Sequence, residues 1–123
     1  MTIKELCERS FETAQTKGFW DKDREIGTLL MLITSELGEA LEADRNNIRT
    51  NKKKLKQALQ ITDTHKFKRF FEENIKDTFE DELADVFIRL GDLCQGLNID
   101  IEKHLELKMK YNQTRKHKHG KNY

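Results

Sequence analysis

Apolar residues recur at intervals of three and four along most of the chain, which is the spacing of one face of an α-helix. The first such stretch runs from Thr2 to Lys17, and Gly18 follows where a helix C-terminus is expected. The second begins near Asp21 to Asp23, whose acidic side chains suit a helix N-terminus, and continues to about Asn46. Because the chain contains no proline, no residue of that type interrupts either helix.

Between Asn47 and Asp77 the pattern is weaker, and we expect two short helices there. Leu55 and Leu59 share one side of the first, and Thr64 is the expected cap of the second. The apolar side of the second helix is formed by Phe67, Phe70, Phe71 and Ile75. The first helix also carries a basic cluster, which consists of Lys52, Lys53, Lys54 and Lys56.

The last third of the chain predicts two further helices. One runs from about Thr78 to Gly96, and the other runs from Ile101 to about Thr114 with Asp100 as its cap. A basic, flexible tail is expected over about residues 115–123. The sequence therefore predicts an all-α helical bundle in a single domain that spans residues 1–123.

Two of the predicted helices carry the same arrangement of acidic and apolar residues. Glu36 and Glu39 lie one turn apart beside the apolar arc of one helix, and Glu82 and Asp85 lie at the equivalent edge of the other. If the helices pack as antiparallel neighbours, with axes about 8–10 Å apart, the four carboxylates converge. Arg89 lies on the same side and is expected to pair with Asp85 one turn earlier.

Converging carboxylates repel one another unless a cation is bound among them. Two unit charges about 4 Å apart interact by roughly 4 kcal/mol near a protein surface. A ligand set made only of carboxylate oxygens favours Mg²⁺, or Mn²⁺ as a substitute, over zinc. The alternative, that these glutamates are ordinary solvated residues, is weakened by the matched register of the two pairs. A di-iron bundle would need Glu-x-x-His pairs, which neither motif contains.

Composition adds an expectation about assembly. Hydrophobic residues make up 36% and charged residues 37% of the 123 positions, so a lone chain has little apolar material for its core. We therefore expect a homo-oligomer. The two cysteines, Cys7 and Cys94, fall on apolar helical positions without metal-ligand spacing, which indicates buried, reduced thiols and a cytoplasmic protein. No apolar run has the length of a membrane span, so no membrane partner is expected.

Charge is unevenly distributed although the net charge is only +1. From Lys108 onwards the chain carries several basic residues and no acid. Such a balance makes nucleic acid an unlikely partner and favours a local phosphate site near the C-terminus.

With these features the sequence resembles the MazG-like family of all-α nucleoside triphosphate pyrophosphatases. The resemblance covers most of residues 20–121 and is carried by Ser35–Ala43, Glu82–Leu90, Leu97–Glu102 and the K-x3-N-x2-R spacing of Lys108, Asn112 and Arg115. It implies an active site that is completed by assembly into a homodimer or homotetramer. It also implies Mg²⁺ bound by Glu36, Glu39, Glu82 and Asp85, and hydrolysis of a nucleoside triphosphate to a monophosphate and pyrophosphate.

Residue roles follow as hypotheses. Lys108 and Arg115 are expected to hold phosphate oxygens, and Asn112 to bind sugar, base or phosphate. Lys121 is expected to close over the phosphates, and Glu39 is our choice of general base. Trp20 is a candidate for stacking on the base of the nucleotide, with a core or interface position as the commoner alternative. For the three residues of the K-x3-N-x2-R spacing, the alternative is a solvated last helical turn.

Two departures from the family pattern leave questions open. Ser35 stands where many members have an acid, and the segment between Arg45 and Thr78 is longer than in compact members. The competing class of function is a non-enzymatic helical module that binds nucleotides or nucleic acids, supported by the basic cluster and the basic tail. Release of pyrophosphate and salt-sensitive binding to DNA or RNA distinguish the two classes.

Overall fold

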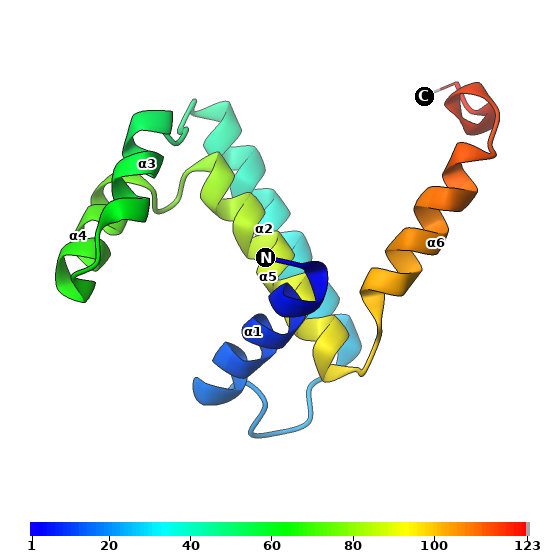
Figure 1. Ribbon diagram of the computed structural model, residues 1–123, viewed down its shortest axis with the longest axis horizontal. Helices are drawn as coiled ribbons and strands as arrows, with labels where there is room; N and C mark the ends of the chain where they lie inside the picture. Colours follow the sequence, from blue (N-terminus) through cyan, green and yellow to red (C-terminus); the bar gives the residue numbers. More distant parts are fainter. Residues whose placement is uncertain (123) are drawn as a thin grey trace. The chain divides into compact units, whose positions relative to one another are not determined.

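The computed structural model describes residues 1–122, which form six α-helices and one short 3-10 helix (Figure 1). The helices are α1 (Ile3–Thr16), α2 (Ile26–Arg45), α3 (Lys52–Gln60), α4 (Thr64–Asn74), α5 (Phe79–Gly96), α6 (Ile101–Gln113) and η1 (His117–Gly120). No strand occurs in residues 1–122, so the predicted all-α class is confirmed. Within the tail that was expected to be flexible, η1 forms a short turn, and Tyr123 lies outside the described residues.

Contacts between Cα atoms divide the chain into two compact units. The first unit contains Met1–Asp21 and the residues from Gly91 onwards, and the second contains Lys22–Leu90. Helix α5 therefore begins in the second unit and ends in the first. No helix within residues 1–122 is both long enough and apolar enough to cross a membrane.

Side-chain caps define where several helices begin. Thr2 and Glu5 form a capping box at α1, and Asp100 accepts a hydrogen bond from the backbone of Lys103 at α6. The cap of α4 is Asp63 rather than the predicted Thr64, because the Asp63 carboxylate reaches the backbone N–H of Lys66 at 2.8 Å. A cap one residue earlier leaves Thr64 as the first residue of the helix itself.

The start of α2 also differs from the prediction. The helix begins at Ile26 rather than near Asp21 to Asp23, and its cap residue Glu25 makes no side-chain cap bond. The preceding connector is fixed by a long-range contact, since Trp20 Nε1 donates a 2.7 Å hydrogen bond to Asp92. The predicted stop of α1 is present, because Gly18 adopts the left-handed φ of +84° just after the helix.

The first unit packs α1 against the C-terminal part of α5. Cys7 and Cys94 are both buried there, as predicted, and burial raises the pKa of each thiol. Gly91 permits the close approach, since a Cβ at this position would lie 3.4 Å from the Cα of Cys7. Phe11 meets the ring of Trp20 edge-on, with ring centroids 5.4 Å apart.

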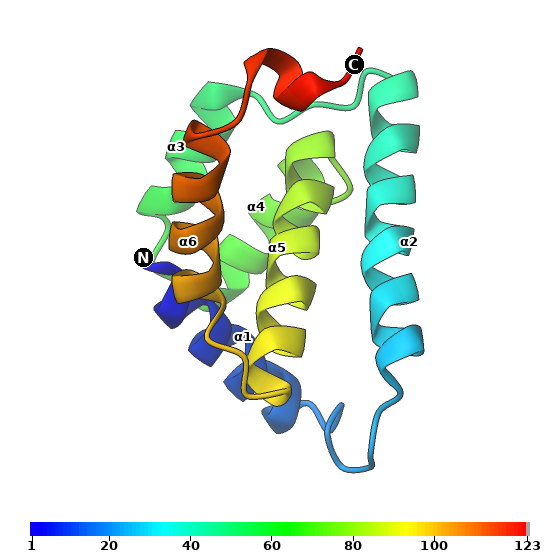
Figure 2. The same ribbon diagram turned by 90° about the vertical axis from the view of Figure 1, so that its right-hand side faces the viewer.

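The second unit is built on α2 and on the part of α5 that ends at Leu90, which lie side by side and run in opposite directions (Figure 2). The backbone of Phe79 donates to the carbonyl of Ile48 at 2.9 Å, and the hydroxyls of Thr50 and Thr78 lie 2.7 Å apart. These bonds tie the segment that follows α2 to the start of α5. Helices α3 and α4 lie between α2 and α5 in the sequence. They pack on each other as a helical hairpin. The acidic pairs are therefore held on two helices whose adjoining ends are hydrogen-bonded together.

Candidate metal centre

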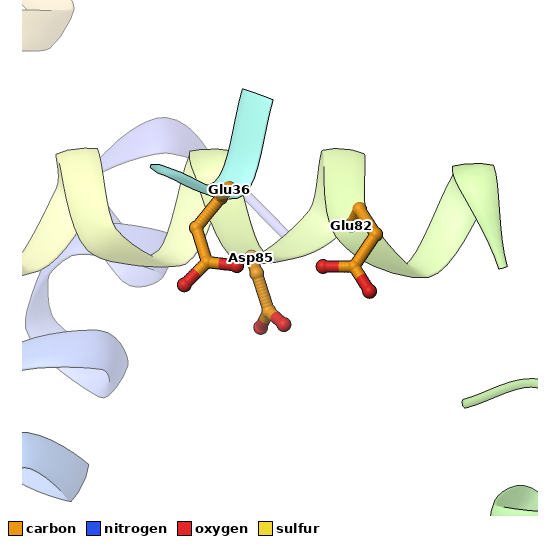
Figure 3. A group of neighbouring side chains, drawn as sticks. All are labelled: Glu36, Glu82 and Asp85. Carbon is orange, nitrogen blue, oxygen red and sulfur yellow. The ribbon is translucent and has the colours of Figure 1, made fainter. Parts of the chain in front are cut away.

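Three of the predicted metal ligands come together between α2 and α5. Glu36, Glu82 and Asp85 each place a carboxylate oxygen within 4.8 Å of the other two (Figure 3). Glu36 projects from α2, and the other two project from successive turns of α5. Only 6% of Glu36 and 4% of Glu82 is exposed, while Asp85 is more accessible. We call these three residues the carboxylate cluster.

Glu39, the fourth predicted ligand, occupies a different position. It lies one turn after Glu36 on α2, is exposed, and is not one of the three converging carboxylates. Its carboxylate lies near enough to Glu82 to raise the pKa of that residue. Glu39 is therefore a neighbour of the cluster on its exposed side.

The cluster has raised acid pKa values. Burial raises the pKa of Glu82 to about 7, together with the neighbouring acid Glu39 and the charges of Glu36 and Asp85. Burial, followed by the nearby acids Asp81 and Glu36, also raises the pKa of Asp85, and Arg89 opposes this effect. The cluster thus holds a proton more tightly than isolated carboxyl groups would.

Arg89 is part of the same arrangement. Its Nε donates a 2.5 Å hydrogen bond to Glu36 Oε1, across the pair of helices. The sequence predicted Asp85 as its partner, because reasoning from one helix identifies neighbours only one turn away. The observed bond links α5 to α2 and supplies a positive charge to a buried carboxylate.

A second acidic group lies at the start of α5 and was not predicted. Asp77, Asp81 and Glu82 also bring carboxylate oxygens within 4.8 Å of one another. However, Asp81 accepts a 3.0 Å hydrogen bond from the backbone of Asp77, which has a left-handed φ of +63°. This bond gives Asp81 a structural role at the turn before the helix. The run of acids from Asp77 to Asp85 in the sequence was the available signal for this group.

The predicted nucleotide-binding residues belong to the first unit, whereas the carboxylates belong to the second. Lys108 and Arg115 both lie over the ring of Tyr111, at 5.1 and 5.8 Å from its centroid. Asn112 is partly buried, and its Oδ1 atom is enclosed without a hydrogen-bond partner among the described residues. Lys121 is exposed and follows η1. These placements leave the predicted roles untested.

Trp20 has partners within its own unit. Its indole N–H is engaged by Asp92, and its ring packs on Phe11 and against the backbone of Gly96. The structure therefore places Trp20 in the packing of the first unit, the commoner of the two alternatives weighed from sequence. Stacking on a nucleotide base stays a prediction.

The carboxylate cluster has the chemistry that a hard divalent cation requires. All three side chains offer oxygen ligands from two helices, and two of them are buried. Buried carboxylates need a compensating charge, which a divalent ion provides. The residues present therefore fit Mg²⁺ or Mn²⁺ better than zinc, which favours nitrogen and sulfur ligands.

No protein-family model matches the chain, and searches of curated proteins and of solved structures find no similar protein. The assignment of function therefore depends on the chemistry of the residues.

Proposed function

We propose that the protein is a Mg²⁺-dependent pyrophosphohydrolase that converts nucleoside or deoxynucleoside triphosphates to monophosphates and pyrophosphate. One observation carries the proposal: α2 and α5 bring Glu36, Glu82 and Asp85 together, and two of these acids are buried. Buried acids are uncommon on helices unless they are paired with a cation. The resemblance of the two acidic motifs to the MazG-like family supplies the reaction type, and clearance of unwanted nucleotides is the cellular role typical of it.

The chain's own residues have distinct parts in this proposal. Glu36, Glu82 and Asp85 hold the cation, which when bound neutralises the triphosphate and polarises the phosphorus under attack. Glu39 is exposed and is a neighbour of Glu82, so its carboxylate is our choice of the group that accepts a proton from an attacking water. Lys108 and Arg115 bind phosphate oxygens in the same proposal.

Asn112, Trp20 and Lys121 complete the proposed set of nucleotide contacts. The enclosed Oδ1 of Asn112 lacks a hydrogen-bond partner among the described residues, as expected for an atom that accepts from a ligand. We further propose that the protein acts in the cytoplasm as a homodimer or homotetramer, which agrees with its buried thiols and its exposed apolar residues.

The test is release of pyrophosphate from a panel of nucleotides with Mg²⁺, using wild-type protein and charge-removing variants. We expect Glu36→Gln and Asp85→Asn each to lower turnover by at least about a hundredfold, because each removes an anionic ligand. Glu42→Gln is the matched control on α2, since Glu42 is exposed and bonds only to Asn46 and Arg45 among the described residues.

Circular dichroism shows whether each variant keeps its helices. Full turnover in both cluster variants would exclude the cluster from catalysis. Loss of helicity in either would instead indicate a structural role for that carboxylate.

The competing function is a non-enzymatic module that binds nucleotides or nucleic acids. It is favoured by the exposed lysines of α3, among them Lys52, Lys53 and Lys56. Salt-sensitive binding to DNA or RNA, without release of pyrophosphate from any nucleotide, would support this module over the enzyme.

A further inference from the structure

We propose that Arg89 is the built-in counter-ion of the carboxylate cluster and that a divalent cation displaces it from Glu36. The inference rests on the proposed metal site and concerns how that site is occupied before a metal binds. It assigns to Arg89 a role in setting metal affinity, which the acidic motifs alone do not indicate.

The geometry places Arg89 directly on a proposed ligand. Arg89 follows Asp85 by one helical turn on α5, so its side chain lies on the same side of the helix as the cluster. Its Nε lies 2.5 Å from Glu36 Oε1. The side chain of Glu36 is only 8% exposed, whereas that of Arg89 is 39% exposed. The pair thus joins a fixed, buried acid to a cation that reaches it from the surface.

Physical chemistry explains why the pair forms without a metal. A buried, ionised carboxylate is costly unless it is hydrogen-bonded to an opposite charge. Arg89 provides both the charge and the donor for Glu36, and its charge partly offsets the rise in the pKa of Asp85 that burial causes. The cluster can therefore keep its carboxylates close together before a metal arrives.

The same contact must weaken when the metal binds. A divalent cation among these carboxylates would lie close to the guanidinium. Like charges that close together repel strongly near a protein surface. Glu36 is buried on its helix, while the partly exposed Arg89 has a long side chain whose rotamers change readily. Arg89, rather than Glu36, is the partner that moves.

The first test measures binding of Mn²⁺ alone to the full chain by electron paramagnetic resonance. We expect Arg89→Gln to tighten Mn²⁺ binding by roughly ten- to a hundredfold, because a competing charge-assisted hydrogen bond is removed. Arg45→Gln is the matched control on α2, since the Arg45 side chain is exposed and pairs only with Glu42 among the described residues. Its affinity should equal that of the wild-type protein.

The second test uses the wild-type chain and does not depend on the stability of a variant. We expect the Nε–H resonance of Arg89, assigned by comparison with Arg89→Gln or with Arg89→Lys, to shift as Mg²⁺ is added and to exchange faster with water. A resonance that stays unchanged while Mg²⁺ saturates the site would overturn the displacement.

The outcomes separate this inference from the proposed function. Wild-type protein that binds no Mn²⁺ would overturn both. Wild-type protein that binds Mn²⁺, together with Arg89→Gln that binds it equally or more weakly, would overturn only the inference, because Arg89 would then be neutral or would orient Glu36 for the metal.

Discussion

The proton on Glu82 links the carboxylate cluster to stability. The folded pKa of about 7 lies above the ordinary value of 4.5 for a glutamic acid. Between these two values the unfolded chain has released the proton while the folded chain retains it. Rising pH in this window therefore favours unfolding of the metal-free protein, and the loss is complete above about pH 7.

We predict that removal of the titrating group removes this pH dependence. The glutamine side chain in Glu82→Gln is neutral at every pH. As the pH rises from about 5 to about 8, the variant should therefore gain stability relative to the wild-type protein, by on the order of 3 kcal/mol in the free energy of unfolding. Urea unfolding in the presence of a chelator measures both proteins. A constant difference between them across this range would contradict the raised pKa.

Some positions in the site could be predicted from the sequence, and others could not. The sequence predicted that Glu36, Glu82 and Asp85 meet. Each lies at the edge of an apolar arc, and such edges adjoin when two helices pack on each other. The bond of Arg89 to Glu36 was not predictable, because a helical wheel shows neighbours on one helix and not across two. The separate position of Glu39 depends on side-chain rotamers, which the spacing does not specify.

At the scale of helices, local signals predicted the elements and long-range contacts decided their ends. The apolar spacing predicted all six helices, and Asp100 caps α6 as expected. The late start of α2 was not predictable, because the connector before it is held by Trp20 and Asp92, which are 72 positions apart. A single-sequence pattern does not contain such a contact.

The same connector gives a test of packing in the first unit. A Cβ on Gly96 would lie 2.3 Å from two atoms of the Trp20 ring, which Asp92 and Phe11 hold in place. We predict that Gly96→Ala lowers the free energy of unfolding by about 1–3 kcal/mol through this overlap. Thermal or urea unfolding measures the change.

Gly38 provides the control for helix propensity. A Cβ at Gly38, on α2, would meet nothing within 4 Å. Gly38→Ala should therefore stabilise the protein by about 0.5–1 kcal/mol, because alanine restricts the unfolded chain and favours the helix. Equal effects of the two substitutions would show that the Trp20 ring does not limit the space at Gly96.

At the scale of the whole molecule, many large apolar side chains are exposed on the single chain. Within the described residues, no large side chain is fully buried. The arc of α2 that was predicted to face a core is only partly covered, since half of each of Leu30, Leu37 and Leu41 is exposed. Exposed apolar patches commonly mark sites of contact between proteins. The thin core expected from composition is therefore present, and the expected partner subunit stays a prediction.

We predict that a second copy covers the arc of α2 and that folding is coupled to this association. The midpoint of thermal unfolding should then rise with protein concentration, and light scattering after size exclusion should give the mass of a dimer or tetramer. Leu30→Lys should shift the protein towards monomer, because in a symmetric interface one substitution places a charge against apolar surface on each subunit.

Leu59→Lys on α3 is the control, since Leu59 is 80% exposed and lies outside the arc. This variant should keep the wild-type mass, because the hairpin takes no part in the predicted interface. A monomeric wild-type protein whose unfolding midpoint does not change with concentration would contradict the assembly. The proposed active site would then have to be complete within one chain, and the exposed arc of α2 would need a different partner.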